Sequence, residues 1–244
     1  SRFHNYSTKN GLAGDNITAI ETDEQGNIVW VATTEGLSLF DPSISSGASS
    51  NRFINYTEKN GLLSSNITVM HRDKDGNVWL GTNKGVSKLQ RNKKSFEGKN
   101  FENYTVINGL CDSIVTAIAE DNNGLLWFGT KNGVSKFDPS DLMRSDAGSF
   151  KTYTTKNGLT DNEVKYIAVD KENNLWVSTM KGLNKLEGET FSQHHITDNP
   201  MGNKMPCLFP DFEGNLWLGT HNGLYKQREN AFTTYTEKDG LGTS

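Results

Sequence analysis

The sequence predicts an all-β protein built from repeats, and three observations lead to this prediction. All five tryptophans stand in copies of one short phrase, and glycines, of which the 244-residue chain has 24, recur at fixed places around it. Apolar residues show almost no helical periodicity. Aromatic residues make up 10% of the chain and prolines are few, which is typical of short strands joined by tight turns.

The repeated phrase joins a tryptophan to a small residue, a threonine and a glycine. Its second copy runs from Trp79 through Gly81 and Thr82 to Gly85. Successive tryptophans are 49, 48, 49 and 41 residues apart, a spacing that indicates an array of similar structural units. These tryptophans are Trp30, Trp79, Trp127, Trp176 and Trp217.

Each copy offers four strand-like runs separated by turn residues, which we name strands A to D in chain order. In the second copy, strand A contains Ile67, strand B contains Trp79, strand C follows Gly85, and strand D reads Phe101-x-x-Tyr104. Four strands in a unit of this length favour the radial blades of a β-propeller over solenoid coils, which usually repeat faster.

The predicted fold is therefore a β-propeller of four-stranded antiparallel blades, with five repeats in a single domain over residues 1–244. A segment of a larger, seven- or eight-bladed propeller is the alternative. The repeats span approximately residues 10–57, 60–105, 108–154, 157–195 and 198–236.

Three repeated residue types have expected structural roles. Each tryptophan should lie between blades, and the small residue two positions later, such as Gly81, should let neighbouring sheets approach. The aspartate of each A–B turn should cap the turn through its own side chain, because a calcium loop would need a longer series of oxygen ligands. The threonines should cap the B–C turns. The aspartates are Asp23, Asp73, Asp121, Asp170 and Asp211.

Strand D occurs once more often than the other strands, because Phe3-x-x-Tyr6 near the start of the sequence is a close copy of Phe232-x-x-Tyr235. We expect the C-terminal copy to pair within its own blade, since the connection to it is short. The N-terminal copy, an extra outer strand at residues 3–7, would then be displaced or pair with a neighbouring chain. Insertions in three C–D connections, at residues 43–52, 91–100 and 140–149, are expected to be surface loops.

Charge and apolar content exclude several classes of partner. The chain has 25 basic and 29 acidic residues, a net charge of −4, so neither nucleic acid nor anionic lipid is an expected partner. No apolar run is long enough for membrane insertion. The two cysteines, Cys111 and Cys207, form neither a disulfide framework nor a metal-ligand pattern, and no metal ion or cofactor is predicted.

The repeat resembles that of the two-component regulator propeller family, which occurs in the sensor regions of bacterial hybrid histidine kinases. The matching residues are Gly61-Leu62, Asn66-Ile67, Asp73-x-x-Gly76-Asn77-Val78-Trp79-Leu80-Gly81-Thr82 and Gly85-Val86. More distantly, the repeat is similar to that of virginiamycin B lyase. The resemblance to the sensor family implies a periplasmic or extracellular location and the sensing of oligosaccharides, although five repeats depart from that family's usual seven blades.

The candidate ligand-binding residues come from the D–A loops, which in a propeller share one rim with the B–C turns and surround the central pocket. Amides, hydroxyls and carboxylates at such a rim can hydrogen-bond sugar hydroxyls, and ordinary solvated loop residues are the alternative interpretation. No tryptophan suited to stacking on a sugar is obvious in these loops. The candidates are Asp15, Asn16, Ser65, Asn66, Asp112, Ser113, Asp161, Asn162, Glu163, Asn203 and Lys204.

These features favour a non-enzymatic module that binds a carbohydrate, another polar ligand or a protein partner at this rim, and no catalytic residue is assigned. A glycosidase or lyase acting on a polysaccharide is one alternative, and glycoside hydrolysis would need two carboxylates at a set separation. Only Asp15, Asp112, Asp161 and Glu163 qualify for that role. A structural module that self-assembles by exchanging terminal strands is the other alternative.

Overall fold

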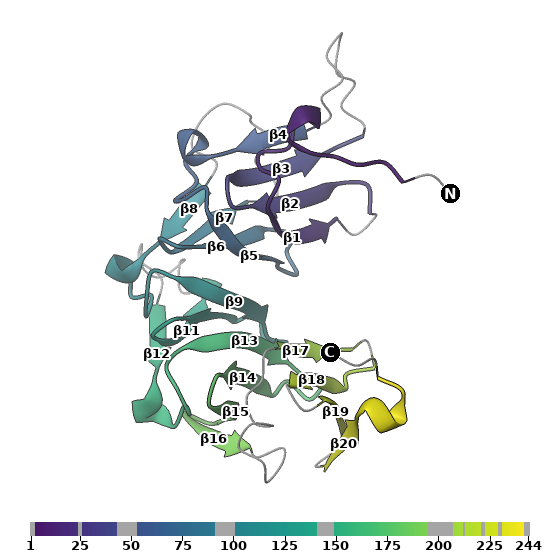
Figure 1. Ribbon diagram of the computed structural model, residues 1–244. Coiled ribbons are helices and arrows are strands. Elements are labelled where there is room, and N and C mark those ends of the chain that lie inside the picture. The colour runs from purple at the N-terminus through teal and green to yellow at the C-terminus, as the bar shows by residue number, and fades with distance from the viewer. Residues whose placement is uncertain are drawn as a thin grey trace. The chain divides into compact units, whose positions relative to one another are not determined.

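The computed structural model describes residues 3–23, 26–42, 53–90, 101–140, 149–194, 207–211, 213–220, 223–228 and 231–241. Within these residues the chain forms five four-stranded antiparallel sheets, and its helices are short 3₁₀ turns (Figure 1). The predicted all-β fold of propeller-type blades is therefore confirmed. The insertions predicted in three C–D connections lie almost entirely outside the described residues.

Each sheet takes its strands in chain order, so that strand A lies at one edge and strand D at the other. We name the sheets blade 1 to blade 5. Blade 1 contains β1 (Ile17–Thr22), β2 (Val29–Thr33), β3 (Gly36–Phe40) and β4 (Phe53–Tyr56). Blade 2 contains β5 (Ile67–Arg72), β6 (Val78–Thr82), β7 (Val86–Leu89) and β8 (Phe101–Tyr104). Blade 3 contains β9 (Val115–Glu120), β10 (Leu126–Thr130), β11 (Gly133–Asp138) and β12 (Ser149–Tyr153).

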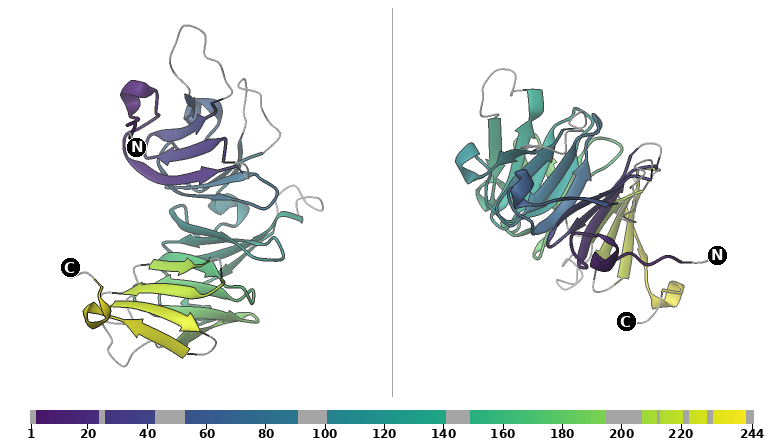
Figure 2. Two further views of the ribbon diagram at one scale, coloured as in Figure 1. Left: turned by 90° about the vertical axis from the view of Figure 1, so that its right-hand side faces the viewer. Right: turned by 90° about the horizontal axis from the view of Figure 1, so that it is seen from above.

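Blades 4 and 5 repeat this order. Blade 4 contains β13 (Val164–Val169), β14 (Leu175–Thr179), β15 (Gly182–Glu187) and β16 (Thr190–His194). Blade 5 contains β17 (Cys207–Pro210), β18 (Leu216–Thr220), β19 (Gly223–Arg228) and β20 (Ala231–Tyr235). The 3₁₀ turns, of which η1 (purple) and η6 (yellow) stand out in Figure 2, are η1 (Thr8–Asn10), η2 (Glu58–Asn60), η3 (Val106–Asn108), η5 (Thr155–Asn157) and η6 (Glu237–Asp239).

The blades are distributed over two compact units. Unit 1 comprises Ser1–Ile107 and Ser113–Val115, and therefore contains blades 1 and 2. Unit 2 comprises Asn108–Asp112 and Thr116–Ser244, and contains blades 3 to 5 apart from the first residue of β9.

An aspartate carboxylate closes each A–B turn and, in blades 2 to 5, also holds the indole of the repeated tryptophan. Asp73 Oδ1 accepts a hydrogen bond from Asn77 N at 2.7 Å, and Asp73 Oδ2 accepts one from Trp79 Nε1 at 2.7 Å. The same two bonds recur in blades 3, 4 and 5. In blade 1, Asp23 Oδ1 caps the turn by accepting hydrogen bonds from the backbone N–H groups of Asn27 and Ile28. The predicted turn-capping role of these aspartates is confirmed.

Neighbouring blades within each unit pack face to face through apolar side chains. Leu37 of blade 1 and Leu80 of blade 2 are both fully buried in the cluster that joins the blades of unit 1. Similar clusters in unit 2 join blade 3 to blade 4 and blade 4 to blade 5. A Cβ atom at Gly129 would lie 2.6 Å from Val164 Cγ1. The predicted need for a small residue at this position is therefore confirmed for blade 3.

The threonine of the repeated phrase caps the B–C turn, as predicted. Thr82 Oγ1 donates a hydrogen bond to Gly85 O at 2.8 Å and accepts one from Lys84 N at 3.0 Å. Gly85 has a φ of +135°, and a Cβ atom there would lie 2.4 Å from Tyr104 O. Both the backbone conformation and the space therefore require glycine at this turn.

The two copies of the surplus strand D behave differently. β20 pairs with β19 from Leu224 opposite Tyr235 to Arg228 opposite Ala231, so the C-terminal copy completes its own blade as predicted. Residues 3–7 form no strand in the structure, in contrast to the extra outer strand expected there. Tyr6 instead packs edge-on against Phe53 with ring centroids 5.5 Å apart. An aromatic contact rather than a ladder of hydrogen bonds therefore holds this segment to blade 1.

Replacement of Trp79 by alanine should lower the free energy of unfolding by about 3–5 kcal/mol, because it leaves a cavity where the fully buried indole stacks on Tyr104. Trp79→Phe retains much of the packing but removes the indole N–H, so that the buried Asp73 carboxylate loses a hydrogen-bond donor. The free energy of unfolding of this variant is expected to fall by about 1–3 kcal/mol. Urea unfolding followed by circular dichroism measures both values. Equal losses in the two variants would contradict this division between packing and hydrogen bonding.

Deletion of residues 231–244 should destabilise the protein far more than deletion of residues 1–9. The first deletion removes a hydrogen-bonded strand and exposes the edge of β19. The second removes an aromatic contact of about 0.5–1.5 kcal/mol and the solvent-exposed hydrogen bonds of Ser7 and Thr8 in the η1 loop. Thermal melting of the two truncated proteins tests this. A lost melting transition on removal of residues 1–9, with an unchanged transition on removal of residues 231–244, would show that the assignment of the closing strand is wrong.

Stability should fall in acid partly through Asp211. Desolvation by itself would raise the pKa of Asp211, but hydrogen bonds from Trp217 and Asn215 outweigh it and lower the pKa to about 2. Because the folded pKa lies below the unfolded value of about 4, the stabilisation is present above about pH 4 and is lost as the pH falls toward 2. Melting temperatures of the wild type and Asp211→Asn should converge over this interval, and parallel curves would contradict the prediction.

Candidate binding rim

The D–A loops and the B–C turns lie at the same end of the blades, as the sequence predicts, and we call this end the rim. In unit 1, Ser64 Oγ of a D–A loop donates a hydrogen bond to Asn83 Oδ1 of a B–C turn at 2.7 Å. In unit 2, Lys181 Nζ of a B–C turn lies 2.8 Å from Asp161 Oδ2 of a D–A loop. Side chains from both kinds of connection are therefore available together at the rim.

The loops before blades 1, 2 and 4 begin with a capped 3₁₀ turn. Before blade 2, Asn60 Oδ1 accepts a hydrogen bond from Thr57 N at 3.0 Å, and Gly61 ends the turn with a φ of 92°. Capping boxes of the same kind are present at η1, η5 and η6. The Ser/Thr-x-x-Asn/Asp-Gly sequence therefore gives these loops one backbone shape.

Side chains of strands C and D fix the backbone of the D–A loop. In blade 2, Asn103 Nδ2 donates to Gly61 O at 3.0 Å, Ser87 Oγ donates to Asn103 Oδ1 at 2.7 Å, and Leu63 N donates to Ser87 Oγ at 3.0 Å. Blade 1 repeats the three bonds with Asn55 and Ser38. Residues that reach the rim from these loops are thus held on a rigid base.

In unit 1, the four candidate residues differ in whether their side chains hold the loop. Asp15 Oδ1 accepts a hydrogen bond from Thr8 N at 2.6 Å, and Asp15 Oδ2 accepts one from Thr8 Oγ1 at 3.1 Å, so this carboxylate stabilises its own loop. Asp15, Asn16 and Asn66 are all exposed, and Ser65 is half-buried. The two asparagines are therefore the exposed candidates whose side chains are not used to hold the loop.

In unit 2, the structure brings three candidates together with residues of the neighbouring turns. Asn162 Oδ1 accepts from Thr155 N at 2.8 Å, while its Nδ2 donates to Asn132 Oδ1 at 3.3 Å. Asp161 is paired with Lys181, and Glu163 Oε1 accepts from Lys165 Nζ at 2.7 Å. We call Asn132, Asp161, Asn162, Glu163, Lys165 and Lys181 the rim cluster.

The remaining candidates lie outside this cluster. Asp112 and Ser113 are half-buried in the loop before β9, and Asn203 and Lys204 lie outside the described residues. The expected convergence of all the D–A loops on one central pocket stays a prediction.

Ion pairing controls the charge of the two rim carboxylates in unit 2. The hydrogen bond from Lys181 is the main cause that lowers the pKa of Asp161. The hydrogen bond from Lys165 is the main cause that lowers the pKa of Glu163. Both carboxylates are therefore ionised at neutral pH, suited to accepting hydrogen bonds rather than to donating a proton.

Sequence reasoning missed the lysines and the asparagine of the rim cluster. Lys181 and Asn132 precede the glycine of the repeated phrase, at a position occupied by Glu35 in blade 1 and Lys84 in blade 2. This variable position within an otherwise regular phrase is the signal that could have identified them. Lys165 stands where blades 2 and 3 have Thr68 and Thr116, so it too departs from the repeat.

Two other kinds of feature are absent from the described residues. No group of three or more histidine, cysteine, aspartate or glutamate side chains there is arranged to hold a metal ion. No helix in the described part of the chain has the length and apolar character needed to cross a membrane.

Comparison with known families confirms the resemblance of the repeats. Four segments of the chain match the family described as two component regulator propeller, at residues 61–84, 109–132, 158–181 and 199–222. Each segment runs from the glycine that ends a 3₁₀ turn, or its equivalent, into the B–C turn. The matched segments therefore contain most of the rim residues. No curated protein matches the chain.

Solved structures share the fold at low sequence identity. The extracellular domain assigned to the one component system BT4673 from B. thetaiotaomicron is 20% identical with a TM-score of 0.75, over 94% of this chain and 31% of that one. The extracellular domain assigned to the hybrid two component system BT3049 from B. thetaiotaomicron is 21% identical with a TM-score of 0.72, over 93% and 30%. Virginiamycin B lyase from Staphylococcus aureus is 16% identical with a TM-score of 0.68, over 91% and 70%.

These similarities establish the propeller-type fold. The chain spans about a third of the length of the two extracellular domains, and more than two thirds of the lyase. The same fold thus occurs in proteins with different roles, and the function has to be argued from the site.

Proposed function

We propose that this chain is a non-enzymatic recognition module of the sensor type, which binds a polar ligand at the rim. The observation that carries the proposal is the rim cluster of unit 2, where carboxylate, amide and ammonium groups lie within hydrogen-bonding reach of one another. Loops held by capping boxes and strand side chains present these groups. Such a preformed polar surface loses little conformational entropy when a ligand binds.

The charge state of the rim supports binding over hydrolysis. A glycosidase needs one carboxylic acid that keeps its proton near neutral pH, usually because its pKa is raised. Asp161 and Glu163 have the opposite property, since lysines lower the pKa of both. Neither carboxylate is therefore suited to act as the acid.

A carbohydrate is the ligand class that fits these groups best. Sugar hydroxyls both donate and accept hydrogen bonds, and the cluster offers acceptors in Asp161 and Glu163 and donors in Lys165 and Lys181. An extracytoplasmic bacterial location is part of the same proposal. Its support comes from the matching repeat family and from the extracellular domains that share the fold.

Removal of one rim carboxylate should weaken glycan binding. A hydrogen bond to a charged group contributes about 1.5–3 kcal/mol, so Asp161→Asn should reduce affinity for a bound oligosaccharide by about tenfold or more. Calorimetric titration with a panel of neutral oligosaccharides measures the effect. Glu189→Gln is the matched control, because Glu189 is also a carboxylate paired with a lysine, Lys151, but belongs to a C–D turn.

Two results would contradict the proposal. One is the absence of binding to every member of the panel. The other is hydrolysis of a glycoside that is lost in Glu163→Gln, which would favour an enzyme.

A further inference from the structure

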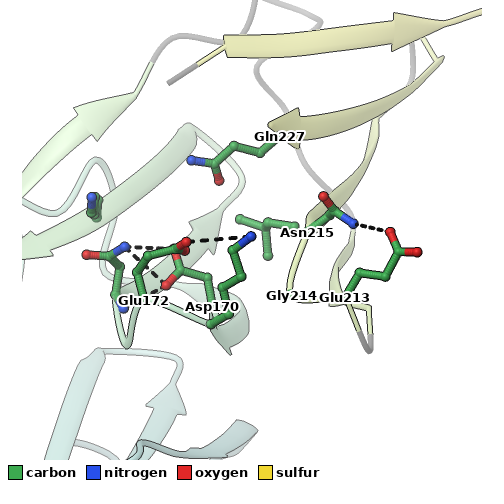
Figure 3. Close-up of a pocket in the computed structure, with 10 residues that line it drawn as sticks. Asp170, Glu172, Glu213, Gly214, Asn215 and Gln227 are labelled. Atoms are coloured by element: carbon green, nitrogen blue, oxygen red, sulfur yellow. Dashed lines mark hydrogen bonds and ion pairs between the residues drawn. The ribbon is translucent and has the colours of Figure 1, made fainter. Parts of the chain in front are cut away.

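A polar cleft opens between blades 4 and 5 at the end of the blades opposite to the rim. It has a volume of about 520 Å³ and lies between the two A–B turns of these blades (Figure 3). Glu172 and Asn174 line it from the turn of blade 4, Glu213 and Asn215 line it from the turn of blade 5, and Gln227 reaches it from β19. All these residues belong to unit 2.

The A–B turns of blades 4 and 5 meet differently from those of blades 3 and 4. Between blades 3 and 4, Asn173 adopts a φ of 65° and its Oδ1 accepts a hydrogen bond from Asn122 N at 2.7 Å. The residue of blade 5 equivalent to Asn173 is Gly214, and blades 2 and 3 likewise have glycines, Gly76 and Gly124, at this position. Lys171 lies against this glycine, since a Cβ atom at Gly214 would be 2.3 Å from Lys171 Cβ.

Gln227 places an amide where the other blades have an apolar side chain. Its cross-strand partner is Phe232, and the residues that pair with the equivalent phenylalanines are Leu89, Phe137 and Leu186. Gln227 is therefore a polar residue at a position that is apolar in blades 2 to 4. Departures of this kind are expected at functional sites.

The cleft lining favours a neutral ligand rich in hydroxyl groups. Lys171 and Glu172 pair at 3.7 Å, and Glu213 Oε2 accepts a hydrogen bond from Asn215 Nδ2 at 3.1 Å and lies 4.0 Å from Lys226 Nζ. The other two charged residues of the lining are also engaged, since Asp170 Oδ2 accepts a hydrogen bond from Trp176 Nε1 and Lys185 lies over the ring of Trp176. The lining therefore has little preference for an ion. The lining instead offers hydrogen-bond donors and acceptors side by side, which suit the hydroxyl groups of a ligand.

We propose that this cleft is a second ligand site, distinct from the rim, which binds a neutral saccharide of about two sugar units. Its volume lies within the range of about 300–1,000 Å³ that is usual for small-molecule sites. Gln227 is the specificity-determining residue of this site, because its amide both donates to and accepts from adjacent hydroxyls. The site does not depend on the function proposed for the rim.

Replacement of Gln227 by leucine separates binding from folding. Leucine is the residue of blade 4 at this position, so Gln227→Leu should keep or raise the melting temperature, while affinity for a disaccharide falls at least tenfold. Cellobiose and maltose are the probes, titrated into the full chain and followed by the NMR signals of the side-chain amides. The signals of Asn174, Asn215 and Gln227 should shift in the wild type, and Glu189→Gln is the control with unchanged affinity.

Three outcomes would overturn the proposal. The first is that neither disaccharide shifts the cleft amides at millimolar concentration. The second is that Gln227→Leu binds as well as the wild type. The third is that binding survives in Gln227→Leu but is lost in Asp161→Asn, which would assign the saccharide to the rim and support the function proposed there.

Discussion

The carboxylate of the A–B turn is the group on which the rest of each blade depends. In blades 2 to 5 one oxygen closes the turn through a backbone N–H and the other accepts the bond of the indole. In blades 3 and 4 the indole is thereby oriented so that its rings pack in the cluster shared with the next blade while its only donor is satisfied. A single aspartate thus connects the local turn, the hydrogen bonding of strand B and the packing between blades. Because this aspartate recurs in every A–B turn, the same sequence motif recurs in each repeat.

Blade 1 departs from this pattern. Its A–B turn has one residue more between aspartate and tryptophan than the turn of blade 2, and its tryptophan is only partly buried. Ile20 is 61% exposed, whereas its counterpart in blade 2, Met70, is 6% exposed. The side chain of Met70 packs in the cluster with blade 1, and Ile20 has no such neighbour among the described residues of unit 1. Burial of the repeated apolar positions is thus a property of the contact between blades, not of the blade alone.

The two ends of the blades use their polar residues in different ways. At the rim, many polar side chains hold the loops, as Asp15 and Asn162 do, and only the remainder are available to a ligand. At the opposite end, the A–B turns are held by aspartate, and the cleft lies where Gln227 replaces an apolar residue of the repeat. Regularity of the repeat therefore supplies rigidity, and departures from it supply the places where a ligand fits.

The fold class, the four strands of each blade, and the structural roles of Asp73, Trp127, Gly129 and Thr82 follow from the sequence alone, because they depend on local turn chemistry and on the period of the repeat. The sequence could not separate a side chain that holds its loop, such as that of Asp15, from one that does not, such as that of Asn66, because that difference depends on the backbone N–H groups that η1 brings near Asp15. The pairing of Asp161 with Lys181 and the cleft beside Gln227 could be found only in the folded chain. Both arise where segments distant in the sequence meet, and one repeat read alone contains neither.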